Sequence, residues 1–326
     1  MRKRRLGSSD LEVTEIALGS WLTYSGGVER EHTEACTRAA FDAGINFFDT
    51  ANVYGNGASE TAWGEILSDY PRSDYVLATK VYFPTDGGSG LSAEQIHKQI
   101  DGSLQRLQTD HVDLYQIHGV DPLTPIDETV WALDDAVRAG KVRYVGVSNH
   151  AAWQIMKALG VSERRGFARF ESVQAYYSVA GRDLEREVVP LVQDQQLGVL
   201  VWSPLAGGLL SGKFSADGGP DGSRRAQFDF PPVDRARAWP IVDAMREIAA
   251  AHDTTVARVA LAWVLGQPWV TSVIIGARTD AQLQDNLAAD ALVLGPDERA
   301  RLDALSALPP EYPGWMIERQ AASRRA

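Results

Sequence analysis

Residues 112–148 read VDLYQIHGVDPLTPIDETVWALDDAVRAGKVRYVGVS and contain two apolar runs separated by a helical segment. The first run, residues 112–118, and the last, residues 142–148, are nearly continuous in apolar and β-branched side chains. Between them, residues 127–139 have the apolar spacing of a helix, and Gly140 follows where helices commonly end. This order is typical of a βαβ unit whose strands are covered on both faces.

The same unit repeats along the chain. The strand candidates are eight short runs rich in β-branched and aromatic residues, at residues 16–20, 46–49, 76–80, 112–118, 142–148, 171–175, 199–203 and 273–276. Each of the first six gaps is about one βα unit long, on the order of 30 residues. The last gap is longer and holds a Gly-, Pro- and Asp-rich stretch, residues 215–232, followed by a helical segment.

Consecutive βα units predict an α/β fold of the (β/α)₈ TIM barrel type rather than a doubly wound sheet. Because no linker or composition break is visible, we predict a single domain over residues 1–326. Residues 4–13 are polar around a Gly-Ser-Ser-Asp turn and predict an N-terminal β-hairpin that caps the bottom of the barrel. Further helices are expected at residues 33–43 and after Ser92.

Composition limits the possible partners. The chain is 44% hydrophobic and 23% charged, with a formal net charge of -11, which argues against a nucleic-acid partner held by phosphate contacts. No run approaches the roughly 18 apolar residues of a membrane span, so no membrane partner is expected. No apolar stretch follows the basic residues 2–5, which we therefore interpret as a solvated first strand rather than a targeting segment.

Cys36 is the only cysteine, which excludes an internal disulfide framework and suits a reducing, cytoplasmic location. It lies in an Ala-rich helical segment, where a small buried side chain is a simpler interpretation than a nucleophile.

Four chemically active side chains follow three successive strands. The second strand ends in Asp49 and leads to Tyr54, the third ends in Lys80, and the fourth ends in His118. Each has an ordinary structural interpretation on its own, as a buried ion pair, loop packing or a core histidine. In a (β/α)₈ barrel, however, all four would meet at the carboxyl ends of the strands, where active sites lie. Their joint position therefore favours catalysis.

These four groups together suit the polarisation of a carbonyl. A phenol with a pKa of about 10 is a poor proton donor to a developing alkoxide, and a neighbouring ammonium lowers that pKa. We therefore predict Tyr54 as the acid, with Lys80 adjusting its pKa and Asp49 holding Lys80 charged. His118 would donate a hydrogen bond that orients the carbonyl oxygen.

Such a site needs a source of hydride. The six histidines lack metal-ligand spacing and G-x-S-x-G is absent, so we predict no metal and no serine hydrolase. No G-x-G-x-x-G follows any strand. The seventh strand instead leads into a Gly-rich segment, residues 202–213, that can surround a pyrophosphate with Lys213 nearby. The eighth leads into residues 275–286, a loop entering a helix beside Arg278.

At this point the residues resemble the aldo-keto reductase superfamily over essentially the whole chain. Four of them match its catalytic tetrad in order and strand position: Asp49, Tyr54, Lys80 and His118. Residues 18–21 and 202–208 look closer to bacterial reductases related to potassium-channel β subunits than to aldose reductase. Having His118, rather than the glutamate of the family's steroid double-bond reductases, implies carbonyl rather than alkene reduction.

The resemblance implies an NADP(H) cofactor and its contacts. Ser148 and Asn149 resemble the pair that holds the nicotinamide carboxamide, and Gln174 looks like its third partner. Trp202 falls where the family places a ring stacked on the nicotinamide. The predicted cofactor contacts are Ser20, Trp21, Asp49, Ser148, Asn149, Gln174, Trp202, Ser203, Leu205, Gly207, Lys213, Gly276, Arg278, Gln282 and Asn286.

At the adenosine end, Arg278 is predicted to select the 2′-phosphate of NADP(H) over NAD(H). Arg224 and Arg225 are further candidates for this charge. Asp285 stands where the family commonly has glutamate, a mild departure at the adenine contact.

The expected partner is a small-molecule carbonyl substrate. The predicted pocket residues are Trp21, Tyr24, Tyr54, Phe83 and His118, with Trp202 and Trp315 as further candidates. Their aromatic character favours apolar or planar carbonyl compounds. We expect the loop around Phe228 and Phe230, and residues 308–314, to shape the pocket. Oligomeric state is not predicted.

Two functions fit this sequence. One is an enzyme that reduces aldehydes or ketones, and the other is a non-catalytic NADP(H)-binding subunit or redox sensor. The intact tetrad favours the enzyme, because a sensor needs cofactor affinity but no proton donor.

Overall fold

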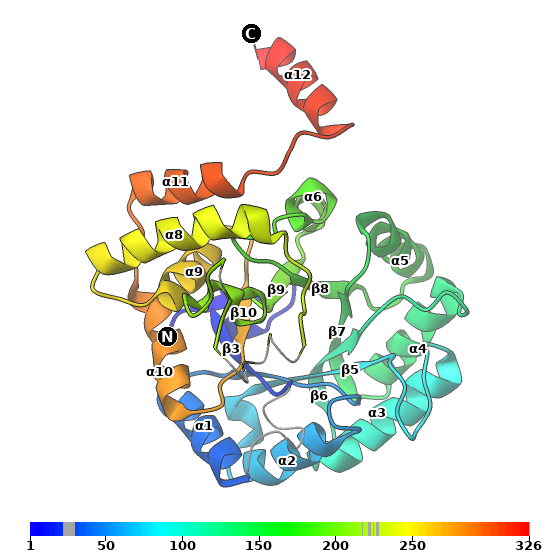
Figure 1. The fold of residues 1–326 in the computed structure, drawn as a ribbon. Helices are drawn as coiled ribbons and strands as arrows, with labels where there is room; N and C mark the ends of the chain where they lie inside the picture. The colour runs from blue at the N-terminus through cyan, green and yellow to red at the C-terminus, as the bar shows by residue number, and fades with distance from the viewer. Residues whose placement is uncertain (22–29, 217, 221–222, 224, 226–227, 326) are drawn as a thin grey trace.

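The computed structural model describes residues 1–21, 30–216, 218–220, 223, 225 and 228–325. Eight parallel strands close into a barrel in the order β10-β3-β4-β5-β6-β7-β8-β9 (Figure 1). These strands are β3 (Ile16–Gly19), β4 (Phe47–Asp49), β5 (Val76–Val81), β6 (Val112–Ile117), β7 (Val142–Ser148), β8 (Phe170–Tyr176), β9 (Gly198–Trp202) and β10 (Ser272–Ile275). Every bound lies within one residue of its predicted position, and the predicted (β/α)₈ barrel is confirmed.

Helices surround the barrel (Figure 1). They are α1 (Arg30–Asp42), α2 (Ala58–Leu67), α3 (Ala93–Leu107), α4 (Ile126–Arg138), α5 (Ala152–Arg165), α6 (Leu184–Gln195), α8 (Arg235–Ala251), α9 (Val256–Leu265), α10 (Asp280–Leu287) and α11 (Pro296–Ser306). A further helix, α12 (Gly314–Arg325), projects away from the barrel (Figure 1). Short 3₁₀ helices are η1 (Arg72–Asp74), η2 (Ala206–Ser211) and η3 (Ala288–Ala291). Ser92 caps α3 by accepting a hydrogen bond from Gln95 N. The last gap holds two helices, α8 and α9, where one helical segment was predicted.

The predicted N-terminal hairpin is present, with β1 (Lys3–Arg5) paired antiparallel to β2 (Glu12–Thr14). An inner core joins the hairpin to the barrel interior: Leu6, Leu11, Val13, Ala17, Phe47, Val76, Ala78, Leu114, Leu200 and Ile274. The hairpin therefore closes one end of a packed barrel. The prediction of a solvated basic strand is wrong for Arg4, which is paired with buried Glu15 at 2.5 Å. Arg4 also donates to Leu265 O, since carbonyls at the end of α9 need donors.

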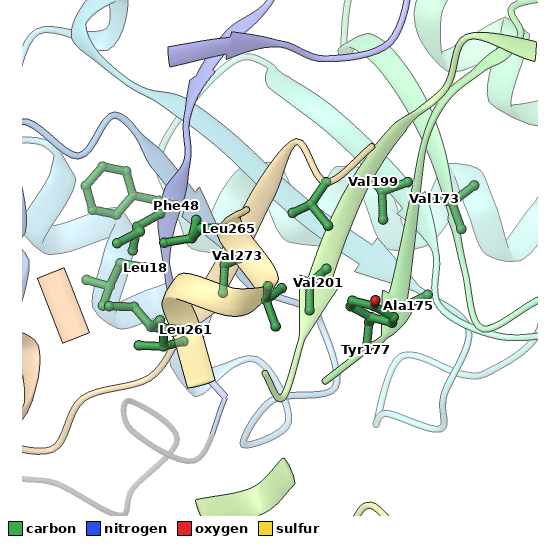
Figure 2. Packing of buried hydrophobic residues seen from close by; sticks show 14 of the residues in the cluster. Leu18, Phe48, Val173, Ala175, Tyr177, Val199, Val201, Leu261, Leu265 and Val273 are labelled. Atoms are coloured by element: carbon green, nitrogen blue, oxygen red, sulfur yellow. The ribbon is translucent and has the colours of Figure 1, made fainter. Parts of the chain in front are cut away.

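An outer core lies between the strands and the helices. Figure 2 shows Leu261 and Leu265 of α9 beside Leu18 and Val273 of the barrel. Strand alternation separates the two cores, because Leu77 belongs to the outer core and its neighbours in β5 face inward.

Two findings concern the helices. Cys36 is buried on α1, as expected of a small apolar side chain. Within the described ranges, no single helix is long and apolar enough to span a membrane, and α8 with α9 meets that requirement only as a pair bent by 101°.

Candidate active site

Lys80 connects the catalytic candidates at the floor of the barrel mouth. Its side chain is fully buried, because its position in β5 points it into the barrel. Its Nζ donates to Asp49 Oδ2 at 2.6 Å, to Thr50 O at 2.7 Å and to Tyr54 Oη at 3.3 Å. Burial lowers the pKa of Lys80. Asp49 and Tyr54 together raise it by more than burial lowers it, so the pKa lies above its ordinary value. Lys80 therefore carries its charge at neutral pH.

Asp49 uses both carboxylate oxygens. Oδ2 accepts from Lys80, and Oδ1 accepts from Gln174 Nε2 at 2.8 Å and from Gln116 Nε2 at 3.2 Å. Gln116 was not predicted, although alternation along β6 places it on the same inner face as His118. Three donors fix the orientation of this buried carboxylate, which in turn holds Lys80 in place.

Tyr54 has a less acidic phenol than expected. Burial raises its pKa above the ordinary value of 10.0, and Lys80 lowers it without cancelling that effect, while Asp49 raises it further. The predicted lowering of the Tyr54 pKa by Lys80 is therefore present, but burial, which was not considered in that prediction, outweighs it. Tyr54 consequently keeps its proton at neutral pH and is available as a donor.

His118 lies between two aromatic rings, with its centroid 5.7 Å from that of Tyr54 and 4.9 Å from that of Phe83. Burial, and then the charge of Lys80, hold its pKa well below 6.5. Its Nδ1 is buried without a hydrogen-bond partner among the described residues. A neutral imidazole with a free nitrogen beside Tyr54 suits a hydrogen bond to a bound carbonyl oxygen.

Asp49, Tyr54 and His118 open onto a cavity of about 1010 Å³, whereas Lys80 is fully buried and is not among the residues that line it. It is lined by most of the predicted residues: Trp21, Asp49, Tyr54, Phe83, His118, Ser148, Asn149, Gln174, Trp202, Ser203, Leu205, Gly207, Lys213, Gly276, Arg278, Gln282 and Asn286. Ser20 is not among them, because it is buried and donates from Oγ to Thr50 Oγ1 at 2.7 Å. Tyr24 lies outside the described residues.

At one end of the cavity lie the groups predicted to hold a nicotinamide. Ser148 Oγ is buried without a partner in the described part of the chain. Asn149 accepts from Trp202 Nε1 at 3.1 Å and donates to His118 O at 3.0 Å. Trp202 stacks on Phe230 with centroids 5.6 Å apart and 6° between the ring planes, so a bound nicotinamide would share or replace this contact.

The Gly-rich segment after β9 provides a concave backbone. Gly207 has a φ of 65°, and a Cβ there would lie 2.2 Å from Phe230 O. Ser203 and Ala206 also have positive φ, at 52° and 49°. Only glycine therefore fits at residue 207. Without a side chain there, a ligand such as a pyrophosphate can approach the backbone amides closely.

Arg225 stabilises this segment through hydrogen bonds to its backbone. It is buried and donates from Nη1 to Ala206 O and from Nη2 to Pro231 O at 2.9 Å. It also pairs with Asp229 at 2.9 Å. Its proposed share in 2′-phosphate binding competes with these contacts, and Arg224 lies outside the described residues.

Two exposed cations, Lys213 and Arg278, line the same cavity. Within the described part of the chain, neither Lys213 nor Arg278 has an ion-pair partner. Arg278 N donates to Gln282 Oε1 at 3.0 Å, at the start of α10. Asp285, in contrast, pairs with Arg258 Nε at 2.8 Å and accepts from Thr255.

Several lining residues were not predicted or were placed differently. Thr255 was missed, since it precedes α9 far from any strand end in sequence. Phe228 and Phe230 line the cavity, as expected. Trp315 and residues 308–314 do not line the cavity, so the prediction that they shape it is wrong. They lead into or lie on α12, which projects away from the barrel (Figure 1). Trp315 packs against Tyr312 instead.

The residues present fit a dinucleotide. The cavity is lined by a buried hydroxyl without a partner among the described residues, a Gly-rich concavity and exposed cations, which are groups that suit a carboxamide, a pyrophosphate and a phosphate. Tyr54, whose phenol accepts a hydrogen bond from the Lys80 ammonium, lines the same cavity.

Comparison with known proteins agrees. The Aldo/keto reductase family profile matches residues 15–307. An uncharacterised oxidoreductase of Bacillus subtilis is 41% identical over 300 residues, covering 87% of this chain and 89% of the relative. A probable voltage-gated potassium channel subunit beta of Oryza sativa is 35% identical, covering 89% and 91%. An NADH-specific methylglyoxal reductase of Escherichia coli is 32% identical, covering 89% and 93%. The chain therefore belongs to the aldo/keto reductase family.

Proposed function

We propose that this protein reduces aldehydes or ketones to alcohols with NADPH, and that Tyr54 is the general acid. The observation that carries the proposal is the contact of Lys80 Nζ with both Asp49 and Tyr54 Oη at the floor of the cavity. A binding function alone gives no reason to bury an ammonium against a phenol, because burying charge is costly.

The bound cofactor would supply the hydride that the carbonyl carbon accepts. Tyr54 Oη donates the proton that the carbonyl oxygen gains, and Lys80 stabilises the phenolate that remains. Asp49 keeps Lys80 charged and oriented. His118, neutral at physiological pH, donates a hydrogen bond to the same oxygen and stabilises the negative charge that develops there.

The preference for NADPH rests on two features of the adenosine end. Arg278 and Lys213 are exposed cations without ion-pair partners among the residues described, and a 2′-phosphate would supply one. The carboxylate of Asp285 is paired with Arg258, so its charge is neutralised and does not repel a 2′-phosphate. NADH is the alternative, because the E. coli relative is described as NADH-specific. Titration of Arg278→Ala with both cofactors distinguishes them.

The substrate is proposed to be an apolar or planar carbonyl compound. Phe83 packs near His118, and Trp21 lies 6.3 Å from Tyr54 between ring centroids. Phe228 and Phe230 both lie edge-on to the Trp21 ring. An aromatic enclosure of this kind gains free energy from apolar area rather than from charge. We further propose a cytoplasmic location, on the single cysteine.

A non-catalytic cofactor-binding subunit is the second candidate, because the rice relative is described as a probable channel subunit. The test measures NADPH oxidation in the presence of a panel of aromatic and aliphatic aldehydes, and the loss of NADPH absorbance reports the rate. A reductase oxidises NADPH only when a carbonyl compound is added. A binding subunit takes up NADPH and shows no carbonyl-dependent oxidation.

A further inference from the structure

Glu60 is a buried carboxylate that the proposed reaction does not use. It lies on α2, the helix that follows Tyr54, and has no exposed surface. It accepts hydrogen bonds from Thr79 Oγ1 and from Arg106 Nε, the latter at 2.7 Å. Burying a carboxylate costs several kcal/mol unless it is paired, and an apolar pair of similar volume is often as stable. The charge therefore calls for an explanation beyond core packing.

Thr79 and Lys80 are consecutive on β5, so their side chains point to opposite faces of the strand. Lys80 faces into the barrel and contacts Tyr54 Oη, whereas Thr79 faces outward and donates to Glu60. Tyr54 is joined to the same helix, because Ser59 N donates to Tyr54 O at 3.3 Å. These contacts connect β5 to α2 through Thr79 and Glu60, connect α2 to Tyr54 through Ser59, and connect Tyr54 back to β5 through Lys80.

We propose that Glu60 is a positioning residue that holds Tyr54 against Lys80 through its bonds to Thr79 and Arg106. The inference rests on the proposed function, in which the contact between Lys80 and Tyr54 sets the acidity of the phenol.

Of the three contacts of Lys80 Nζ, the one with Tyr54 Oη is the most easily lost. Lys80 Nζ lies 2.6 Å from Asp49 and 2.7 Å from Thr50 O, but 3.3 Å from Tyr54 Oη. The first two partners lie on or beside β4 and stay with the barrel, whereas Tyr54 leads directly into α2. An outward shift of α2 would lengthen the Tyr54 contact first, because it is already the longest. The bond from Thr79 to Glu60 opposes that shift.

Thr79→Val tests this, because it keeps the side-chain volume and removes the hydroxyl. We expect kcat for carbonyl reduction to fall by about ten- to a hundredfold, as a small misplacement of a catalytic group does. NADPH affinity should stay within about twofold. In crystal structures the separation of Tyr54 Oη and Lys80 Nζ should exceed about 3.5 Å. Thr79→Ser restores the hydroxyl and should restore both.

Thr37→Val is the matched control. Thr37 is fully buried on α1, and its hydroxyl donates to Thr33 O at 2.9 Å, away from the cavity. Losing a buried hydroxyl there should lower the melting temperature by an amount similar to Thr79→Val and leave kcat unchanged.

The positioning role is overturned if Thr79→Val behaves as the control does, with lower stability, normal kcat and an unchanged Tyr54–Lys80 separation. If Thr79→Val does not fold, Glu60→Gln is measured in the same way, since it keeps an acceptor for Thr79 and loses the charge facing Arg106. The separation is read without substrate. It therefore decides the positioning role even if the wild-type protein reduces no carbonyl, a result that refutes the proposed function alone.

Discussion

Replacing Lys80 with methionine removes the ammonium and keeps a side chain of similar length in a fully buried position. Lys80 Nζ lies 3.3 Å from Tyr54 Oη. With an effective dielectric constant of about 20, an ammonium at that distance stabilises a phenolate by roughly 5 kcal/mol. Asp49 acts on Tyr54 in the opposite direction and offsets part of this. If about half of the stabilisation is expressed in the transition state, kcat falls by roughly a hundredfold.

Stability changes must be separated from this chemical effect. Lys80→Met leaves Asp49 buried with Gln116 and Gln174 as its side-chain donors, which should cost about 3–5 kcal/mol of unfolding free energy. Adding Asp49→Asn removes the unpaired charge and should restore most of the stability but none of the turnover. Urea unfolding and steady-state reduction of an aromatic aldehyde measure the two quantities. A double variant that regains kcat together with stability would refute the role of the ammonium in catalysis.

Three further predictions concern the cofactor site and pH. Arg278→Ala should weaken NADPH binding at least tenfold, since a charge-assisted contact contributes about 1.5–3 kcal/mol, and equal weakening of NADH in fluorescence titrations would contradict phosphate recognition. Gly207→Ala should weaken NADPH binding about tenfold, because a Cβ there meets a facing backbone oxygen at 2.2 Å. Gly166→Ala, at a φ of 67° with open space around it, is the matched control and should cost only about 1 kcal/mol of stability. The reduction rate should be flat between about pH 6 and 8, because the pKa of His118 lies well below 6.5 and that of Tyr54 above 10.0. It should fall only as the pH rises through the pKa of Tyr54, and a loss on acidification through pH 6.5 would show that His118 gains a proton there.

The strand bounds and the catalytic group were predictable from sequence for a physical reason. Strands such as β5 and β8 are buried on both faces, so their apolar runs begin and end with the strand. Barrel closure places the carboxyl ends of all strands at one mouth, so the meeting of Asp49, Lys80 and His118 can be predicted without knowing how the loops fold.

Features that depend on packing between distant segments were not predictable. The net direction of the Tyr54 pKa depends on burial, which no local pattern reports. Stacking of Phe230 on Trp202 and the contacts of Arg225 depend on the path of a long loop. The direction of α12 depends on the residues before it, and Trp315 was placed in the pocket on its aromatic character alone.

The turnover of Tyr54→Phe with NADPH and an aromatic aldehyde tests the proton-donor role most directly. The variant keeps the ring and its packing against Trp21, and removes only the transferable proton and the contact with Lys80. NADPH affinity and thermal stability should therefore survive, while kcat falls by on the order of 10²–10⁴. A kcat within a few fold of the wild type, or a loss of NADPH binding and stability along with activity, would contradict that role and favour the non-catalytic binding subunit.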